Sequence, residues 1–276
     1  MRMLYVSGLH ISSAQRLSSK WRKTMLLGSE ASLQKHIPVT RQMTRKTLYA
    51  MLSSNGMVYV KPSIGSLGRG VMRVERYHDQ FNGRRISYAY QLGASRIVFG
   101  NYEALYSALL KETNGKRYIV QRGIHALKHN GNVFDLRVVV QRAPSGGWEV
   151  TGIVGRVAQS GKVVSNGTQG GSIMPAEQLL YNHVGIVNHH RLIRQIEKLS
   201  IQTMKKMHRA NSRLREIGID IAVDRELKPW ILEVNVRPDH CPFAVLRDQS
   251  MINRIIEYGA AYGRKYKLDC FRKKAN

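Results

Sequence analysis

The hydrophobic positions of the chain follow two different periods, and the two periods alternate along the sequence. Apolar residues at helical spacing are typical of amphipathic helices, whereas strict alternation of apolar and polar residues is typical of half-buried strands. The first pattern predicts helices over residues 13–35, 44–54, 101–112, 188–215 and about 248–263. The second pattern predicts strands over residues 57–60, 71–77, 84–90, 96–99, 117–121, 132–142, 148–158, 218–224 and 229–236.

Cap and turn signals arrange these elements as an α+β protein. Thr44 and Asn101 stand where helix N-caps are expected, and the Pro-Ser-Gly-Gly sequence at 144–147 predicts a hairpin turn. Most predicted strands are separated by hairpin-length connections, while the helices are grouped before and after them. This order favours antiparallel sheets over a doubly wound parallel sheet.

A lysine and three glycines lie between two of the predicted strands, in VYVKPSIGSLGRGVMRV. Lys61 ends the first strand, and Gly65, Gly68 and Gly70 precede the strand that begins at Val71. A Walker loop requires Lys and then Ser or Thr after its last glycine, and a dinucleotide fingerprint opens a helix, so both are excluded. Two interpretations stay open: a hairpin whose backbone N–H groups fold over phosphates, and an ordinary flexible hairpin.

A second polar group of residues lies in the last predicted hairpin, GIDIAVDRELKPWILEVNVRP. Because side chains alternate along a strand, its polar faces are expected to consist of Asp220, Ala222 and Asp224, and of Glu233, Asn235 and Arg237. The apolar faces are expected to consist of Ile219, Ile221 and Val223, and of Trp230, Leu232, Val234 and Val236. A turn centred on residues 226 and 227 places Asp220 directly opposite Glu233.

Two carboxylates that face each other across a hairpin repel, so a cation or a proton must hold them together. The oxygens of Asp220, Glu233 and Asn235 suit Mg²⁺, which takes one or two carboxylates and completes its shell with waters and substrate phosphates. The alternative is an acidic strand that faces solvent. Since the chain has only 18 acidic residues, the sequence favours the metal site.

The strand NVFDLRVVVQR shows the same alternation of faces. Its core face is expected to consist of Phe134, Leu136, Val138 and Val140, and its other face of Asp135, Arg137, Val139 and Gln141. Arg137 can stabilise phosphoryl oxygens, or it can form a structural ion pair with Asp135 or another carboxylate.

In this order the segments resemble the ATP-grasp fold, in which two α+β subdomains clasp ATP between antiparallel sheets. The resemblance lies in the strand ending in Val-Lys-Pro, the glycine hairpin, the strand YIVQRGI and the terminal D…E-V-N hairpin. More narrowly, the chain is similar over about residues 18–250 to the endospore coat-associated ATP-grasp family of the YheC/YheD type. The segments that carry this similarity are SKWRKTMLL, HIPVT, YVKPSIGSLGRGV, YIVQRGI, FDLRVVVQ, GWEVTGIVGRVA, VVSNGTQGGS and WILEVNVRPD.

The resemblance implies roles for individual residues. The implied ATP-binding residues are Lys20, Lys61, Gly65, Ser66, Gly68, Gly70, Gln121, Gly123, Ile124, Arg156 and Asn166. The implied metal ligands are Asp220, Glu233 and Asn235, with two Mg²⁺ ions or Mn²⁺ in their place, and Arg137 and Lys61 are the implied catalytic residues. Three of these residues have plainer interpretations: Lys20 as an exposed lysine, Arg156 as a strand-surface charge and Asn166 as a turn former.

The resemblance also suggests a division of the chain. Residues 1–17 are expected to be an N-terminal extension in place of the separate N-terminal domain of typical ATP-grasp ligases. Residues 18–264 are the expected ATP-grasp domain, with a nucleotide lobe at about 55–122 and a metal and phosphate lobe at about 123–264, followed by a basic tail at 265–276. Many ATP-grasp proteins have an acidic residue at the hinge position where this chain has Gln121. This difference affects only the expected adenine or ribose contacts.

The charge balance is unusual, because 44 Lys and Arg against 18 Asp and Glu give a net charge of +26. The excess is spread along the chain, which favours a generally basic solvated surface over one dedicated nucleic-acid groove. Attraction of an anionic substrate, such as an acidic peptide or polymer, and non-specific contact with nucleic acid stay open.

The remaining composition indicates the compartment. No run approaches 18 apolar residues, and the apolar stretch at the start is too short for a signal peptide, so we expect a soluble, cytoplasmic protein, with spore or coat association implied by the resemblance. Cys241 and Cys270 are the only cysteines, which is no disulfide framework and fits a reducing compartment. We expect a semi-buried thiol at Cys241 and surface histidines at His189 and His190.

Together these features predict a Mg²⁺-dependent, ATP-binding ligase that phosphorylates a substrate carboxylate and lets an amine or similar nucleophile attack the acyl phosphate. The alternatives are a non-catalytic, structural spore protein that retains the nucleotide fold, an ATP-dependent kinase and a polyanion-binding protein. The acceptor and the oligomeric state stay open.

Overall fold

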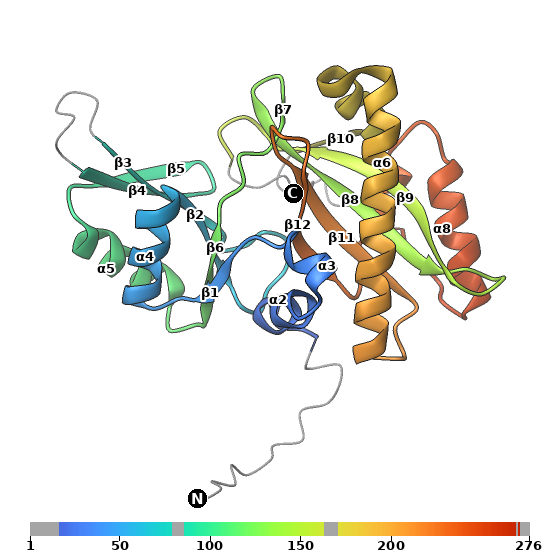
Figure 1. Ribbon diagram of the computed structural model, residues 1–276, viewed down its shortest axis with the longest axis horizontal. Helices are drawn as coiled ribbons and strands as arrows, with labels where there is room; N and C mark the ends of the chain where they lie inside the picture. The colour runs from blue at the N-terminus through green and yellow to red at the C-terminus, as the bar shows by residue number, and fades with distance from the viewer. Residues whose placement is uncertain (1–16, 79–85, 163–170, 269, 271–276) are drawn as a thin grey trace, which may run out of the picture.

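A computed structural model describes residues 17–78, 86–162, 171–268 and 270, which fold around two antiparallel sheets (Figure 1). The first sheet has the strand order β1 (Thr40–Gln42), β6 (Tyr118–Arg122), β2 (Met57–Pro62), β3 (Met72–His78), β4 (Ile86–Leu92) and β5 (Ser95–Phe99). The second has the order β10 (Ser172–Pro175), β9 (Trp148–Val157), β8 (Asn132–Arg142), β11 (Glu216–Val223) and β12 (Pro229–Asn235), and β7 (Lys128–His129) pairs with β8. The α+β prediction with antiparallel sheets is confirmed.

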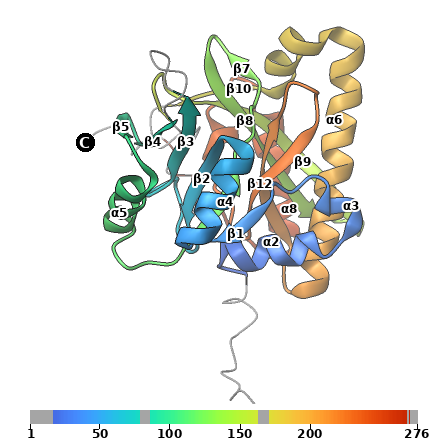
Figure 2. The ribbon, with the colours of Figure 1, turned by 60° about the vertical axis from the view of Figure 1, so that its left-hand side comes forward.

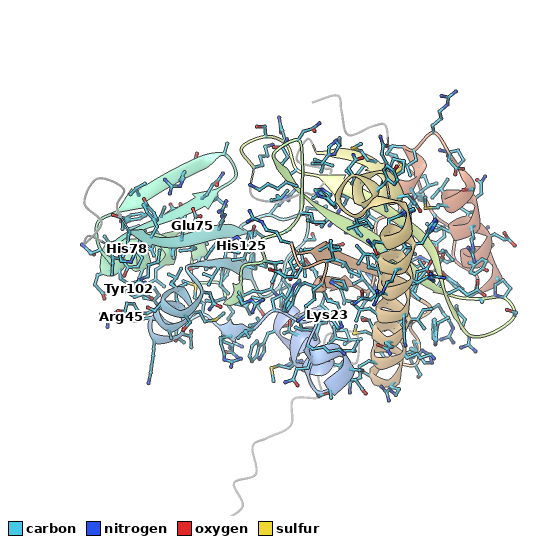
Figure 3. All side chains as sticks on the ribbon, turned by 45° about the horizontal axis from the view of Figure 1, so that its top comes forward. Lys23, Arg45, Glu75, His78, Tyr102 and His125 are labelled. Atoms are coloured by element: carbon cyan, nitrogen blue, oxygen red, sulfur yellow. A yellow bond between two sulfur atoms is a disulfide. The ribbon has the colours of Figure 1, made fainter. Side chains whose placement is uncertain are left out.

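Two capped helices, α4 (Arg45–Asn55) and α5 (Tyr102–Thr113), cover one face of the first sheet (Figure 2). The Thr44 side chain accepts the Thr47 N–H, and the Thr47 hydroxyl accepts the Thr44 N–H. The Asn101 side chain accepts the Ala104 N–H at the start of α5, so both predicted caps are confirmed. The Tyr102 hydroxyl also donates to the Arg45 carbonyl at 2.6 Å and joins the two helices (Figure 3). The opposite face of this sheet is therefore left to the functional site.

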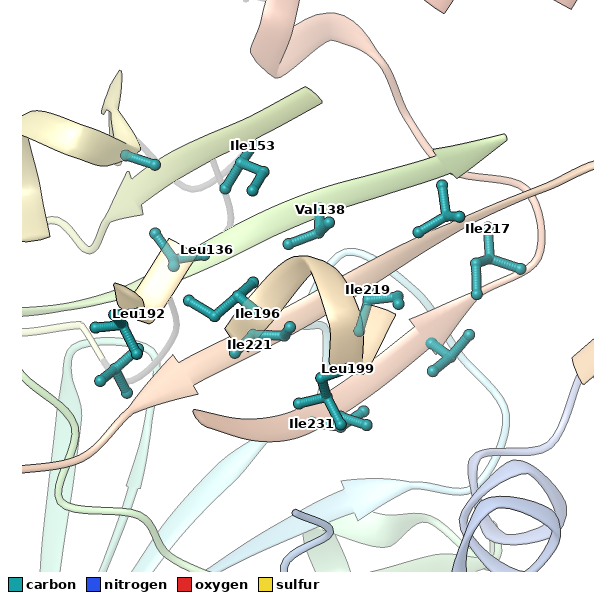
Figure 4. Close-up of a cluster of buried hydrophobic side chains, with 14 of the residues drawn as sticks. Leu136, Val138, Ile153, Leu192, Ile196, Leu199, Ile217, Ile219, Ile221 and Ile231 are labelled. Atoms are coloured by element: carbon teal, nitrogen blue, oxygen red, sulfur yellow. The ribbon is translucent and has the colours of Figure 1, made fainter. Parts of the chain in front are cut away.

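The long helix α6 (Ala176–Ala210) covers one face of the second sheet (Figure 1). Figure 4 shows the resulting core, in which Leu192, Ile196 and Leu199 of α6 meet Leu136, Val138, Ile153, Ile217, Ile219, Ile221 and Ile231 of the strands. The short α7 (Cys241–Ala244) and α8 (Ser250–Ala261) cover part of the opposite face around Val139 and Val154. The rest of that face carries polar side chains of β8 and β11.

Two helix predictions need correction. The helix predicted over 13–35 is described from residue 17 onward and consists of α2 (Lys20–Gly28) and the short α3 (Ala31–Gln34), because Ser29 ends α2 by donating its N–H to helix carbonyls. The helix predicted from 188 begins at Ala176 instead, and its first part is set off by Gly185, whose backbone is non-helical (φ 69°, ψ 176°). Glycine adopts this positive φ readily, so it interrupts the apolar pattern on which the prediction relied.

The β11–β12 hairpin contains a bulge that the alternation pattern did not predict. Asp220 lies opposite Glu233, as expected, but the next pair joins Ile221 to Ile231 and leaves Leu232 without a partner. Trp230 and Leu232 therefore pack on the side of Ala222, whereas Ile231 packs with Val234 in the core. The predicted apolar face of this strand was wrong for its first half, because one extra residue reverses the alternation.

The segment after α8, expected as a basic tail, is attached to the second sheet. Tyr266 packs against the core around α8, and its hydroxyl donates to the buried carboxylate of Glu216. Cys241 and Cys270 form a disulfide, so the expectation of a free thiol at Cys241 was wrong. These cysteines lie 29 residues apart, and Tyr266 packs against His240, the residue before Cys241.

The histidine predictions have different outcomes. His189 is 8% exposed and therefore buried, which corrects the expected surface position, whereas His190 is exposed as predicted.

No helix within the described ranges combines the length and the apolar character that a membrane crossing requires.

Replacing Cys270 with Ser is expected to lower the free energy of unfolding. A cross-link between residues 29 positions apart reduces the entropy of the unfolded chain by an amount worth roughly 3–4 kcal/mol. Urea unfolding of the oxidised protein and of Cys270→Ser measures the difference, and a strong reductant should bring the wild-type protein to the stability of the variant. Equal stabilities under oxidising conditions would contradict the structural role of the disulfide.

Candidate functional site

A cleft between the two sheets collects seven of the fifteen predicted site residues. It is lined by Tyr59, Lys61, Gly68, Val71, Gln121, Arg122, Ile124 and Ala126 on the side of the first sheet and the segment that follows β6. On the side of the second sheet it is lined by Val133, Phe134, Asp135, Arg156, Asp220, Ala222, Leu232 and Glu233. The site therefore combines residues that are far apart in the sequence.

Lys61 reaches the cleft because of its position in β2. Val58 and Val60 point into the core of the first sheet, so the alternating side chains of Tyr59 and Lys61 point to the opposite face. Lys61 Nζ donates to Gln121 Oε1 at 2.6 Å. Burial lowers the pKa of Lys61 to about 8, against the opposing effect of nearby Glu233. The ammonium is therefore still protonated at neutral pH, but it is held by one neutral hydrogen-bond partner and so is prepared for an anion.

The glycine loop is a hairpin, as predicted, because β2 and β3 pair in antiparallel fashion with Val60 opposite Met72. Gly68 and Gly70 have φ values of 67° and 70°, which L-residues with side chains rarely adopt. A Cβ atom at Gly70 would also lie 2.8 Å from the Tyr118 hydroxyl. The loop thus depends on glycine for its backbone course. Gly68 lines the cleft, whereas Gly65 and Ser66 are exposed at the tip of the loop.

A buried chain of ion pairs crosses the second sheet on the cleft side. Arg156 binds both carboxylate oxygens of Asp135 at 2.7 and 2.8 Å, and its Nη2 also lies 3.0 Å from Asp220 Oδ2. Arg137 Nε donates to Asp220 Oδ1 at 2.6 Å. These two guanidinium groups hold the pKa of the Asp220 carboxyl well below its usual range despite burial. Asp220 is therefore ionised at neutral pH.

This chain decides the interpretation of Arg156 and shows one of the two contacts expected for Arg137. Arg156 is 3% exposed, so it is not a strand-surface charge. Arg137 pairs with Asp220, which is the structural alternative that the sequence left open, although it also lies beside the proposed metal carboxylate. Asp135 takes part in the site and was missing from the predicted set. Its alternation with Arg137 along β8 was the signal that could have identified it.

Glu233 is held by the first turn of α2. Lys20 Nζ lies 2.8 Å from Glu233 Oε1 and donates to the Gly65 carbonyl at 2.8 Å. Lys20 is 8% exposed, so it is not the exposed lysine of the plainer interpretation. The structure thus places Lys20 between the glycine loop of the first sheet and the carboxylate hairpin of the second.

Lys23, one turn further along α2, was not predicted to belong to the site. Its side chain is buried between the two sheets, where its ammonium donates to the Val234 carbonyl (Figure 3). Burial lowers the pKa of Lys23, nearby Lys20 lowers it further, and Glu233 opposes the change. Helical spacing of three residues between Lys20 and Lys23 was the available signal, because it places both on one face of α2.

The predicted metal ligands suit Mg²⁺ in their chemistry. Asp220 and Glu233 lie directly opposite each other on β11 and β12, and Asn235 lies two residues further along, opposite Gly218. Carboxylate and amide oxygens are the donors that this ion prefers. Within the described ranges no three His, Cys, Asp or Glu side chains gather into a closed metal site.

The remaining predicted residues have different positions. Ile124 lines the cleft, and Gly123 lies beside it, where a Cβ atom would come within 2.9 Å of the Met57 carbonyl and closer still to the Met57 side chain. Gln121 donates from Nε2 to the Thr40 hydroxyl at 3.3 Å, which fixes the orientation of its amide. Asn166 lies outside the described residues.

The site carries more positive than negative groups. Six cationic side chains gather around three carboxylates: Lys20, Lys23, Lys61, Arg122, Arg137 and Arg156 around Asp135, Asp220 and Glu233. The difference leaves three positive charges in a partly buried place, where charge is costly unless it is compensated. A bound anion would supply this compensation.

The structure has two antiparallel sheets that enclose a cleft, with a glycine hairpin on one wall and a carboxylate hairpin on the other. This arrangement agrees with the ATP-grasp fold that the sequence resembles. Residues 11–265 match the family described as YheC/D like ATP-grasp. The chain therefore belongs to this ATP-grasp family, and the predicted fold class is confirmed.

Two relatives come from Bacillus subtilis (strain 168). The chain is 22% identical over 191 residues to the endospore coat-associated protein YheD, covering 68% of this chain and 40% of the relative. It is 20% identical over 225 residues to the endospore coat-associated protein YheC, covering 80% of this chain and 60% of the relative. The chain thus spans about half the length of these relatives.

The lowered pKa of Lys61 predicts a pH dependence of anion binding. Below about pH 8 the ammonium is protonated and attracts phosphate, and above that pH the free protein progressively loses this charge. The affinity for a non-hydrolysable ATP analogue should therefore fall by up to about tenfold per pH unit above pH 8. Titration calorimetry between pH 6.5 and about 9.5 would measure this change.

Lys61→Arg is the matched control, because a guanidinium keeps its charge across this range. Its affinity should stay flat where that of the wild-type protein falls. Parallel pH profiles for both proteins would show that Lys61 does not carry the effect.

Proposed function

We propose that the cleft binds ATP and that the protein is a Mg²⁺-dependent ligase joining a substrate carboxylate to an amine or a similar nucleophile. The observation that carries this proposal is the excess of three positive charges around Lys61 and the Asp220–Glu233 pair. A polyphosphate supplies the anion that such a site needs, and membership of the ATP-grasp family supports ATP as its source.

The proposed roles follow from where each residue lies. The apolar wall formed by Tyr59, Ile124, Ala222 and Leu232 suits the adenine ring, next to Gln121 and Gly123. Lys61 and Arg156 would bind phosphates from opposite walls of the cleft. The glycine loop with Gly65, Ser66, Gly68 and Gly70 would cover them, because its backbone N–H groups can approach phosphate closely. In this proposal residues 55–122 supply the nucleotide lobe and residues 123–264 the metal and phosphate lobe.

Asp220, Glu233 and Asn235 would hold Mg²⁺, as one or two ions that Mn²⁺ can replace. When bound, the ion would neutralise the charge on the phosphate oxygens. Arg137, which lies against Asp220, would keep this carboxylate ionised and add positive charge on the same side of the phosphates.

The proposed reaction has two steps. A carboxylate oxygen of the acceptor bonds to the γ-phosphorus while the bond to the β-phosphate oxygen breaks, which gives an acyl phosphate and ADP. The nucleophile then attacks the acyl carbon, loses its proton, and displaces inorganic phosphate. Lys61 and Arg137 would stabilise the transferring phosphoryl group, and the glycine loop would exclude water from the acyl phosphate. This assignment requires no nucleophilic side chain.

The net charge of +26 supports an anionic acceptor, such as an acidic peptide or polymer. Non-specific contact with nucleic acid would follow from the same field and is expected to weaken steeply with salt. The association of the two relatives with the endospore coat, given in their names, supports a place at the spore coat for this protein too.

A second candidate function is a non-catalytic nucleotide-binding protein of the spore. It is favoured by one observation, namely that internal cations already pair with both proposed metal carboxylates: Arg137 and Arg156 with Asp220, and Lys20 with Glu233. The experiment below separates the two candidates.

An acceptor screen tests the ligase directly. The protein is incubated with ATP, Mg²⁺ and amino acids, acidic peptides or cell-wall fragments, and the release of ADP and phosphate is measured. An acceptor that stimulates turnover is then supplied with ¹⁸O in its carboxylate. The acyl-phosphate route transfers one labelled oxygen to the released phosphate, whereas a kinase leaves the γ-phosphoryl group on the acceptor. Binding of ATP without stimulation by any acceptor would support the non-catalytic candidate instead.

Replacing Glu233 with Gln tests the metal site. The substitution keeps the size of the side chain but removes the charge, so Mg²⁺-dependent binding of the ATP analogue should weaken at least about tenfold. Glu257→Gln, on the exposed side of α8, is the control for a general change in charge. Titration calorimetry with and without Mg²⁺ measures the effect, and an unchanged Mg²⁺ dependence in Glu233→Gln would refute the metal assignment.

A further inference from the structure

Lys20 binds two parts of the site at once. Its ammonium pairs with Glu233 on β12 and donates to the carbonyl of Gly65 in the glycine loop, at 2.8 Å in each case. Its backbone N–H also donates to the Ser63 carbonyl at 2.7 Å. One residue of α2 therefore connects the exposed tip of the glycine loop to the carboxylate hairpin.

The two proposed metal carboxylates are held with unequal strength. Asp220 receives hydrogen bonds from Arg137 and lies 3.0 Å from a second guanidinium, that of Arg156, and the fork of an arginine fits a carboxylate well. Glu233 has a single ammonium partner at one of its oxygens, and its side chain is 24% exposed. Glu233 is therefore the carboxylate that exchanges its partner more readily than Asp220 does.

An ammonium and a divalent cation cannot share one carboxylate oxygen at contact distance. The ammonium and the metal ion would repel each other strongly, because like charges a few ångströms apart interact strongly at a partly buried site. A metal ion that binds Oε1 of Glu233 thus competes with the Lys20 ammonium and displaces it. Because the same ammonium donates to the Gly65 carbonyl, its displacement weakens this contact too.

We propose that Lys20 is an internal counter-ion of Glu233 that a divalent cation replaces, and that its departure releases the glycine loop at Gly65. The inference rests on the proposed function in taking Glu233 as a metal ligand. Lys20 is thereby a positioning residue, which holds the loop against α2 in the metal-free protein. The bonds of Ser63 to the Lys20 N–H and the Ser19 hydroxyl remain, so the base of the loop stays fixed while its tip is released.

Lys23 does not have this role, although it lies next to Lys20. Its ammonium donates to the backbone carbonyl of Val234, which a metal bound to the Glu233 side chain does not have to displace. The release is therefore specific to the lysine that touches both the loop and the carboxylate.

Metal affinity and loop exposure test this inference without any measurement of activity. Mn²⁺ binding to the full chain is followed by electron paramagnetic resonance, and amide hydrogen exchange is followed over residues 63–71. Lys20→Met should bind Mn²⁺ roughly five- to tenfold more tightly than the wild-type protein, because the competing cation is gone. Its loop should exchange fast without metal, at the rate that the wild-type loop reaches only when Mn²⁺ is added.

Two further variants act as controls. Lys20→Arg restores a cation at Glu233 and should return the Mn²⁺ affinity toward the wild-type value. Arg22→Met removes a charge from the exposed side of α2 and should change neither measurement. Thermal unfolding of each variant shows whether it is folded, and Lys20→Gln replaces Lys20→Met if that variant is not.

The outcomes separate this inference from the proposed function. Unchanged or weaker Mn²⁺ binding in the folded neutral variants, or a wild-type loop that does not respond to Mn²⁺, overturns the role of Lys20. If Glu233→Gln still abolishes metal-dependent nucleotide binding in that case, the proposed function stands alone. If the wild-type protein binds no Mn²⁺ even with the ATP analogue present, both are overturned.

Discussion

The structure of the site depends on the buried ion pairs of Asp220. A carboxylate in this position is tolerable only because Arg137 and Arg156 reach it from two neighbouring strands of the same sheet. The pairs fix β8, β9 and β11 in one register, and β11 in turn sets the position of Glu233 on β12. An error of one residue in any of these pairings would turn a charged side chain into the core under α6. The same contacts therefore specify the sheet and assemble the site.

Much of the architecture was predictable because it rests on local rules. The caps Thr44 and Asn101, the glycine hairpin and the opposition of Asp220 and Glu233 follow from side-chain chemistry or from strand alternation, which the sequence displays directly. The bulge at Leu232 could not be predicted, because an unpaired residue has no signature of its own in a run of apolar residues. It shifts Trp230 and Leu232 from the core under α6 to the side of Ala222, where Leu232 lines the cleft.

The site was predictable in its composition but not in its connections. The sequence and its resemblance to ATP-grasp proteins identified Lys61, Arg137, Asp220 and Glu233, yet the partner of each charge depends on contacts between segments far apart in the chain. Arg156 could bind Asp135 and Asp220, and Lys20 could bind Glu233, only once both sheets were in place. The disulfide of Cys241 was missed for the same reason, since it joins α7 to the segment after α8, 29 residues further along the chain.

The position of α2 has a consequence for the order in which the protein is made. Lys23 donates to the carbonyl of a residue 211 positions later in the chain, and Lys20 pairs with its neighbour Glu233. During synthesis α2 leaves the ribosome early, but its binding partner on β12 emerges near the end. The first sheet can form long before that moment, because its strands and helices lie within residues 40–122. The cleft is therefore completed late, and a truncated or stalled chain would present α2 with its buried lysines exposed to water.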